Sequence, residues 1–182
     1  MKSLVLAIFR LCGILWCRAW GAQVHPSALI HGFPRIVVKS GASVIIGPRV
    51  TLNASIWSNP FNDGRRTVLF AGPDAAIHLD EDSGVSASRI IAHQSIRIGR
   101  GSLIGAGCLL TDSDMHEIPL GSANSVRVSP ISIGEGVFVG AHTTILKGVE
   151  IADHAVIGAS SVVTGKIPSG TIAAGNPARP IR

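Results

Sequence analysis

Aliphatic residues recur at every sixth position along much of this chain, most clearly toward its C-terminal end. Residues 133–168 divide into the hexads IGEGVF, VGAHTT, ILKGVE, IADHAV, IGASSV and VTGKIP. The fifth place of each hexad is small or aliphatic, and the first place holds a β-branched aliphatic residue: Ile133, Val139, Ile145, Ile151, Ile157 and Val163. Two shorter blocks, at residues 46–57 and 92–109, continue the same spacing.

A period of six is not that of an amphipathic helix, whose apolar positions recur about every 3.6 residues. The β-branched residues favour short strands, and the Gly, Asp and Asn residues between them favour corners. The pattern therefore predicts a solenoid in which successive coils stack their aliphatic side chains into one core. Cys108 stands at the fifth place of a hexad, so we expect a buried small residue there rather than a reactive thiol.

Two segments interrupt the count. Residues 58–69, "SNPFNDGRRTVL", carry Asn, Pro, Gly and two arginines, which is typical of a surface excursion. Later, Ile104 and Ile133 each begin a hexad, but their separation of 29 positions is not a multiple of six. The sequence therefore predicts a loop extruded between about residues 112 and 130.

The predicted loop opens with "TDSDMHEI", in which one histidine, His116, stands among Asp112, Asp114 and Glu117. An imidazole can accept a proton near neutral pH, and a carboxylate on one ring nitrogen would fix the tautomer for general base catalysis. A solvated acidic turn explains the same residues, since Asp and Ser often bond their own backbone in turns. A metal site is a third use, but the histidines show no convincing zinc-ligand spacing, so we expect no metal.

The hexads and the ending "GNPARPIR" resemble the hexapeptide-repeat acyltransferases over residues 24–182. Within that family the chain is most similar to the sugar O-acetyltransferases of the maltose, galactoside and polysaccharide-modifying group. The resemblance implies an all-β fold, a left-handed parallel β-helix with three hexads per coil, in a homotrimer whose sites lie between subunits. We expect a helix at residues 1–23, the β-helix at 24–168 with its loop at 112–130, and a tail at 169–182.

The resemblance also assigns roles to the loop. Sugar O-acetyltransferases place their catalytic histidine in a D-S-D-x-H stretch directly after a coil, and Asp112, Ser113, Asp114 and His116 match that stretch. His116 is then the expected general base. Either Asp112 or Asp114 would orient its ring, and the sequence does not choose between them.

Acetyl-CoA is the acyl donor that the resemblance implies. Family members lay the pantetheine arm along a ladder of small residues, and the corresponding pairs here are Gly140-Ala141 and Gly158-Ala159, 18 residues apart. Small side chains let a ligand approach backbone N–H groups closely, although corners need small residues for structural reasons too. Lys166 and Arg179 follow and would pair with the phosphates of coenzyme A.

Composition narrows the possible partners. The formal charge of +5 could suit a phosphorylated ligand or an anionic membrane surface, but no block of Lys and Arg with interleaved aromatics indicates nucleic acid. The three cysteines match no zinc spacing, and their odd number argues against a disulfide framework, so we expect a cytoplasmic protein.

Residues 1–22 form two apolar runs divided by Arg10 and closed by Arg18. The runs are too short for a transmembrane helix, and Arg10 interrupts what would be the apolar part of a signal peptide. A helix lying on the inner face of the cytoplasmic membrane fits these residues, and so does a terminal helix packed on the domain or on a neighbouring subunit.

The expected function is transfer of acetyl from acetyl-CoA to a sugar hydroxyl in cell-surface polysaccharide biosynthesis. The acceptor would be a sugar, a sugar nucleotide or a lipid-linked sugar. N-acetylation of an amino sugar and a non-catalytic β-helical scaffold are the alternatives, and a scaffold has no need of a histidine flanked by aspartates.

Overall fold

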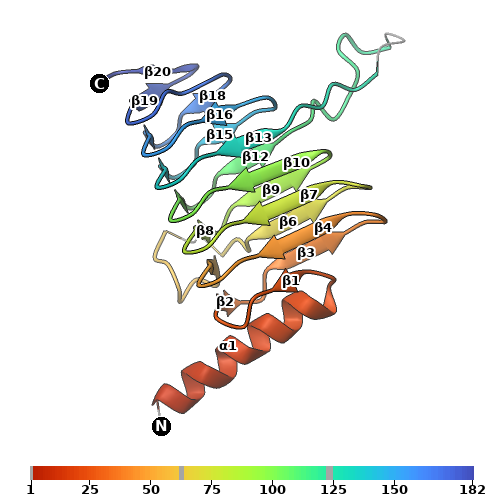
Figure 1. Ribbon diagram of the computed structural model, residues 1–182, viewed down its shortest axis with the longest axis vertical. Helices are drawn as coiled ribbons and strands as arrows, with labels where there is room; N and C mark the ends of the chain where they lie inside the picture. Colours follow the sequence, from red (N-terminus) through yellow and green to blue (C-terminus); the bar gives the residue numbers. More distant parts are fainter. Residues whose placement is uncertain (1, 62–63, 122–124) are drawn as a thin grey trace.

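The computed structural model describes residues 2–61, 64–121 and 125–182, with the side chains of those from residue 11 onward. One helix, α1 (Lys2–Ala19), precedes a solenoid of short strands that winds toward the C-terminus (Figure 1). Neighbouring strands of the solenoid are parallel, and only the last pair, β19 and β20, is antiparallel within the described chain. The prediction of an all-β, left-handed parallel β-helix is confirmed.

The strands form three sheets, one for each side of the coil. Sheet A contains β1 (Gln23–Val24), β4 (Ser43–Ile46), β7 (Ala76–Leu79), β10 (Ser95–Ile98), β13 (Ile131–Ile133) and β16 (Glu150–Ile151). Sheet B contains β2 (Leu29–Gly32), β5 (Thr51–Ala54), β8 (Gly84–Ser86), β11 (Leu103–Ile104), β14 (Phe138–Val139), β17 (Val156–Ile157), β19 (Ile172–Gly175) and β20 (Ala178–Pro180). Sheet C contains β3 (Arg35–Val38), β6 (Val68–Ala71), β9 (Arg89–Ala92), β12 (Leu109–Thr111), β15 (Thr144–Ile145) and β18 (Val162–Val163).

Two corners of the coil matter for function, and each is named for the sheets that it joins. The B–C corner includes residues 55–67, 87–88, 105–108, 140–143 and 158–161. The C–A corner includes residues 93–94, 112–130, 146–149 and 164–166. The two corners therefore lie at opposite ends of the strands of sheet C. Of the loop, residues 112–121 and 125–130 are described, and they leave the C–A corner and project away from the solenoid (Figure 1).

The hexad positions fill the core as the sequence predicts. The six first-place residues between Ile133 and Val163 are at most 2% exposed, and the fifth-place residues are at most 4% exposed. Cys108 is fully buried, and burial raises the pKa of its thiol, so it is an inward-facing core residue. Because aromatics are scarce, stacked Ile, Val, Leu and Ala side chains supply nearly all of the apolar burial.

The helix α1 covers the N-terminal end of the solenoid (Figure 1). Its buried residues Ile14 and Cys17 join the core, and a Cβ added to Gly13 would lie 2.8 Å from the Ile30 side chain. The Trp16 indole N–H donates a 2.9 Å hydrogen bond to the Pro34 carbonyl. Residues 11–19 are therefore packed on the domain, the second of the two arrangements that the sequence allowed. No helix in the described residues is long and apolar enough to span a membrane.

Candidate active site

Asp112 anchors the start of the projecting loop. Its fully buried carboxylate accepts hydrogen bonds from the backbone N–H groups of His93 (2.7 Å) and Gln94 (2.8 Å), which belong to the preceding turn of the C–A corner. A buried carboxylate needs such partners because its desolvation is costly. Asp112 therefore fixes the point where the chain leaves the solenoid, a structural role that the sequence alone did not indicate.

Asp114 is tied down on the other side of the loop base. Its carboxylate forms a 2.5 Å ion pair with Lys147, which lies at the next turn of the same corner. The outgoing and returning chains also pair with each other: Asp114 donates its backbone N–H to Arg127, and Ser129 donates to Asp112. The two chains of the loop thus form a short antiparallel ribbon, with a bridge between Ser113 and Val128.

His116 stands beyond this ribbon and is exposed. Within the described part of the chain, no hydrogen bond or ion pair joins its ring to Asp112, Asp114 or any other residue. The backbone just before it turns back at Met115, whose φ of 64° lies in the left-handed region. The imidazole is therefore accessible to a substrate or a neighbouring subunit. No described residue of the same chain fixes the orientation of its ring.

His93 is the other histidine at this corner. Its Nδ1 lies 3.9 Å from the Asp112 carboxylate, is buried, and has no hydrogen-bond partner among the described residues. Its ring also contacts Phe70, with 5.9 Å between the ring centroids. His93 is thus half-buried beside a carboxylate, one coil below the loop.

At the B–C corner, small residues from successive coils lie one above the other. Ser160 donates its backbone N–H to the Ala141 carbonyl (2.8 Å), and His142 donates to the Ala106 carbonyl (2.8 Å). A Cβ on Gly140 would lie only 2.5 Å from the Ala159 nitrogen. Coil stacking alone therefore requires glycine at position 140, as the structural explanation of this corner predicts.

The alanines of this corner have a second property. Within the described residues, the backbone N–H groups of Ala106, Ala141 and Ala159 donate no hydrogen bond, although Ala106 is buried and Ala141 half-buried. Ala159 is exposed, and the N–H groups of Arg100 and Lys147 at other corners also donate no bond among the described residues, so this corner differs in the small side chains that let a ligand reach its N–H groups. The corner thus carries a ladder of three unused donors, with a rise of about 4.8 Å per coil.

Arg179 lies at the C-terminal end of this ladder. It pairs in register with Ala174 across the β19–β20 hairpin, and Ala174 lies against Gly158. The Arg179 side chain is exposed, and it donates a hydrogen bond to the adjacent Ala178 carbonyl. Gly140, Ala141, Gly158, Ala159 and Arg179 are therefore brought together on one edge of the solenoid.

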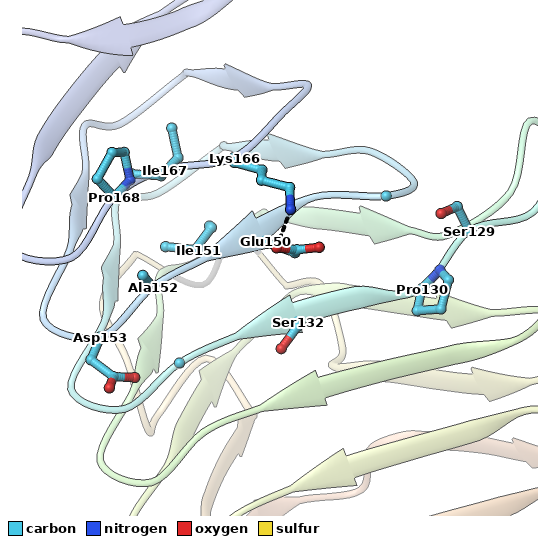
Figure 2. A pocket seen from close by; sticks show the side chains of 12 residues that line it. Ser129, Pro130, Ser132, Glu150, Ile151, Ala152, Asp153, Lys166, Ile167 and Pro168 are labelled. Atoms are coloured by element: carbon cyan, nitrogen blue, oxygen red, sulfur yellow. Dashed lines mark ion pairs between the residues drawn. The ribbon is translucent and has the colours of Figure 1, made fainter.

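Lys166 lies elsewhere, at the C–A corner. It forms a 2.8 Å ion pair with Glu150 across a groove of about 790 Å³ on sheet A. Figure 2 shows this pair spanning the groove, with Ser129 and Pro130 from the returning loop at one end and Pro168 at the other. The ion pair is exposed, so an incoming phosphate could replace Glu150 at little cost.

The candidate residues thus form two groups at opposite ends of sheet C. The loop with His116, the Asp114–Lys147 pair and Lys166 belong to the C–A corner, whereas the small-residue ladder and Arg179 belong to the B–C corner. One chain alone does not bring its imidazole to its own ladder. Among the described residues, no group of three or more His, Cys, Asp or Glu side chains could hold a metal ion.

Comparison with known proteins identifies the class to which these features belong. The family described as "Bacterial transferase hexapeptide (six repeats)" matches residues 130–165. The Escherichia coli K12 protein "Putative lipopolysaccharide biosynthesis O-acetyl transferase WbbJ" is 37% identical over 155 residues, covering 80% of this chain and 74% of that protein. The chain belongs to the hexapeptide-repeat transferase family, and within that family it is an acetyltransferase.

Two further comparisons agree. The galactoside O-acetyltransferase of E. coli K12 is 39% identical over 95 residues, which cover 51% of this chain and 46% of that enzyme. Among solved structures, the N-acyltransferase AntD of Bacillus cereus, a single-residue variant in complex with dTDP-4-amino-4,6-dideoxyglucose and coenzyme A, superposes with a TM-score of 0.68. That likeness covers 91% of this chain and 85% of AntD at 16% identity, so it shows the fold.

Proposed function

We propose that this protein transfers an acetyl group from acetyl-CoA to a hydroxyl of a sugar used in cell-surface polysaccharide biosynthesis. The observation that carries the proposal is the ladder of unused N–H donors at Ala106, Ala141 and Ala159. A linear amide-containing arm, such as pantetheine, offers carbonyl acceptors that can pair with successive coils. The O-acetyltransferase names of both relatives from E. coli support a hydroxyl acceptor.

In the proposed reaction the sugar hydroxyl oxygen attacks the thioester carbon. His116 takes the hydroxyl proton as the new C–O bond forms, and a backbone N–H of the corner stabilises the oxyanion. When the C–S bond breaks, the imidazole returns the proton to the leaving thiolate, giving coenzyme A and the acetyl ester. The transfer is direct, because the one cysteine at the ladder, Cys108, is a buried thiol with a raised pKa.

The separation of the two corners supports a site shared between chains of a homotrimer. The C–A corner of one subunit would contribute His116 and Lys166, and the B–C corner of the next would contribute the ladder and Arg179. A threefold arrangement repeats this contact in a closed ring, so each trimer would contain three equal sites.

Complementation between two inactive variants tests this arrangement. His116→Ala removes the base, and Ala159→Trp fills the exposed face of the ladder without entering the core. Each variant alone should be inactive as a trimer. Co-expressed in equal amounts, they should recover about a quarter of the parent sites, because chance pairs one intact loop with one intact corner in that fraction. No recovery in trimers shown to be mixed would contradict the shared site.

N-acetylation of an amino sugar is the second candidate, and the fold shared with AntD favours it. Release of coenzyme A, measured across matched panels of sugars and amino sugars, distinguishes the two reactions. Absence of release with every acceptor, despite measurable acetyl-CoA binding, would instead favour a non-catalytic scaffold.

A further inference from the structure

A second pocket, of about 540 Å³, opens at the N-terminal part of the B–C corner and is rich in arginine. Among the described residues, eight line it; four of these are Arg35, Arg65, Arg66 and Arg89, and none of the eight is acidic. Its floor includes Ala87 and Gly107. Nothing in the proposed mechanism uses these arginines.

The convergence of the arginines follows from strand register and from the excursion. Arg35 and Arg89 begin β3 and β9, and both pair with Val68, the first residue of β6, from opposite sides. Their Cα atoms are therefore two strand spacings, about 10 Å, apart on the outer face of sheet C. Arg65 and Arg66 lie just before β6, and both line the same pocket as Arg35 and Arg89.

Three of these arginines differ from Arg97 and Arg100 of the solenoid in pairing with no carboxylate among the described residues. Arg97 and Arg100 pair with Asp80 and Glu135. By contrast, the side chains of Arg35, Arg66 and Arg89 make no hydrogen bond or ion pair within the described residues, whereas Arg65 has an interaction of its own. Like charges gathered around one hollow repel each other, and an anion bound there removes that cost.

We propose that this pocket binds the diphosphate group of the sugar acceptor. Guanidinium groups bind phosphate oxygens through paired N–H donors, and several arginines together favour a multiply charged group over a single carboxylate. The volume lies in the range of small-molecule sites, with room for the diphosphate and part of the attached sugar. The acceptor class is therefore a glycosyl diphosphate, from either a nucleotide sugar or a lipid-linked sugar.

The position of the pocket relative to the donor ladder supports this assignment, which rests on the proposed function. Gly107 donates its backbone N–H to Ala87 (3.3 Å), and the next coil continues the ladder through Ala141. The pocket thus lies at the N-terminal end of the ladder, whereas Arg179 lies at its C-terminal end. With coenzyme A phosphates at Arg179, the thioester would point toward a sugar held by the arginines.

Direct binding tests the pocket without requiring catalysis. Inorganic diphosphate is titrated calorimetrically into the full-length parent, into Arg35→Gln/Arg89→Gln, and into Arg97→Gln. The last variant removes one charge, where the double variant removes two, from an outward-facing residue of sheet A. The double variant should bind diphosphate roughly tenfold or more weakly, since it loses two charge-assisted contacts, and Arg97→Gln should change little. Equal affinities in all three proteins would overturn the proposal.

Two additional measurements sharpen the test. Arg35→Lys/Arg89→Lys keeps the charge but loses the paired donors, so its affinity should fall between those of the parent and the glutamine variant. Saturating coenzyme A should leave diphosphate binding unchanged, because donor and acceptor occupy different parts of the corner. If coenzyme A competes with diphosphate, the arginines belong to the donor site and the assignment to the acceptor is wrong.

Acetyl transfer then distinguishes a nucleotide-linked from a lipid-linked diphosphate acceptor. It also tests the pocket assignment separately from the proposed function. The acceptors compared are a nucleoside diphosphate sugar, a polyprenyl diphosphate sugar in detergent, and a neutral methyl glycoside. The glutamine variant should raise KM for the preferred diphosphate acceptor and leave KM for acetyl-CoA unchanged. Acetylation of the neutral glycoside alone would overturn the pocket assignment while the proposed function stands. Arginine-dependent diphosphate binding without acetyl transfer to any acceptor would overturn the proposed function and keep the pocket as an anion site.

Discussion

The buried carboxylate of Asp112 accepts a 2.7 Å hydrogen bond from the backbone N–H of His93 and lies 3.9 Å from the Nδ1 atom of the same residue. The two residues belong to successive turns of the C–A corner. Their contact links the base of the projecting loop to the coil below it, so the position of His116 depends on a hydrogen bond formed four residues earlier in the chain.

Asp112→Asn should therefore act mainly on stability. An amide offers one acceptor oxygen where the carboxylate offers two, so one of the two backbone N–H groups would face an NH₂ group. We expect the free energy of unfolding to fall by about 1–3 kcal/mol, measured by urea denaturation. Asp114→Asn breaks a partly exposed ion pair with Lys147 and should cost less than about 1 kcal/mol. Equal losses in the two variants would show that Asp112 is not the anchor of the loop.

His116→Ala should lower turnover by about 10²- to 10⁴-fold, the usual contribution of a general base. The affinity for acetyl-CoA should change little, because the ladder and Arg179 are assigned to the donor. His154→Ala, at an exposed histidine outside both corners, is the matched control and should keep parent turnover. The measurements are initial rates of coenzyme A release and calorimetric binding of the donor.

His93 provides the competing explanation for the same chemistry. Its ring already has a carboxylate beside it, and its Nδ1 has no other partner among the described residues. The base is His93 if His93→Gln abolishes turnover and removes the increase of turnover with rising pH, while His116→Ala does neither. We expect the opposite result, with His93→Gln lowering stability more than turnover.

The hexad count predicted contacts wherever no insertion intervenes, and failed where one does. Gln94 and Asp112 are 18 residues apart and meet at adjacent turns of one corner, as one coil of three hexads requires. Asp114 and Lys147 are 33 residues apart, and their contact depends on the length of the loop between them, which the repeat does not determine. The same limit concealed the arginine pocket, because the number of residues between Arg35 and Arg89 corresponds to three coils of the repeat, whereas the strand pairing places them two coils apart.

Thiol reactivity offers a check on the core. Burial raises the pKa of Cys17 to about 12 and also raises the pKa of Cys108, so both thiols stay protonated and shielded at pH 8. Cys12 is exposed on the outer face of α1. Iodoacetamide should therefore modify Cys12 alone in the native protein and all three cysteines in urea, as peptide mass spectrometry would show. Rapid labelling of Cys108 in the native protein would show that the B–C corner is more open than the structure indicates.

Membrane association of α1 is the final prediction, and the structure identifies the residues that would carry it. Ile14 and Cys17 face the solenoid, whereas Leu11, Leu15 and Trp20 are each more than half exposed. Apolar side chains of this kind on a terminal helix favour the interface of a bilayer, and the positive net charge favours anionic lipid.

Flotation with anionic and zwitterionic vesicles measures that association for the full-length chain. The parent should float with anionic vesicles, and Leu11→Ser/Leu15→Ser should bind them at least several-fold more weakly, because it removes exposed apolar side chains from α1 and leaves the packed face unchanged. Ile56→Ser/Trp57→Ser, which removes two exposed apolar residues from the B–C corner, is the matched control and should float like the parent. If the parent stays in solution, or if both variants lose binding equally, α1 is only a cap on the first coil and a lipid-linked acceptor must reach the site without it.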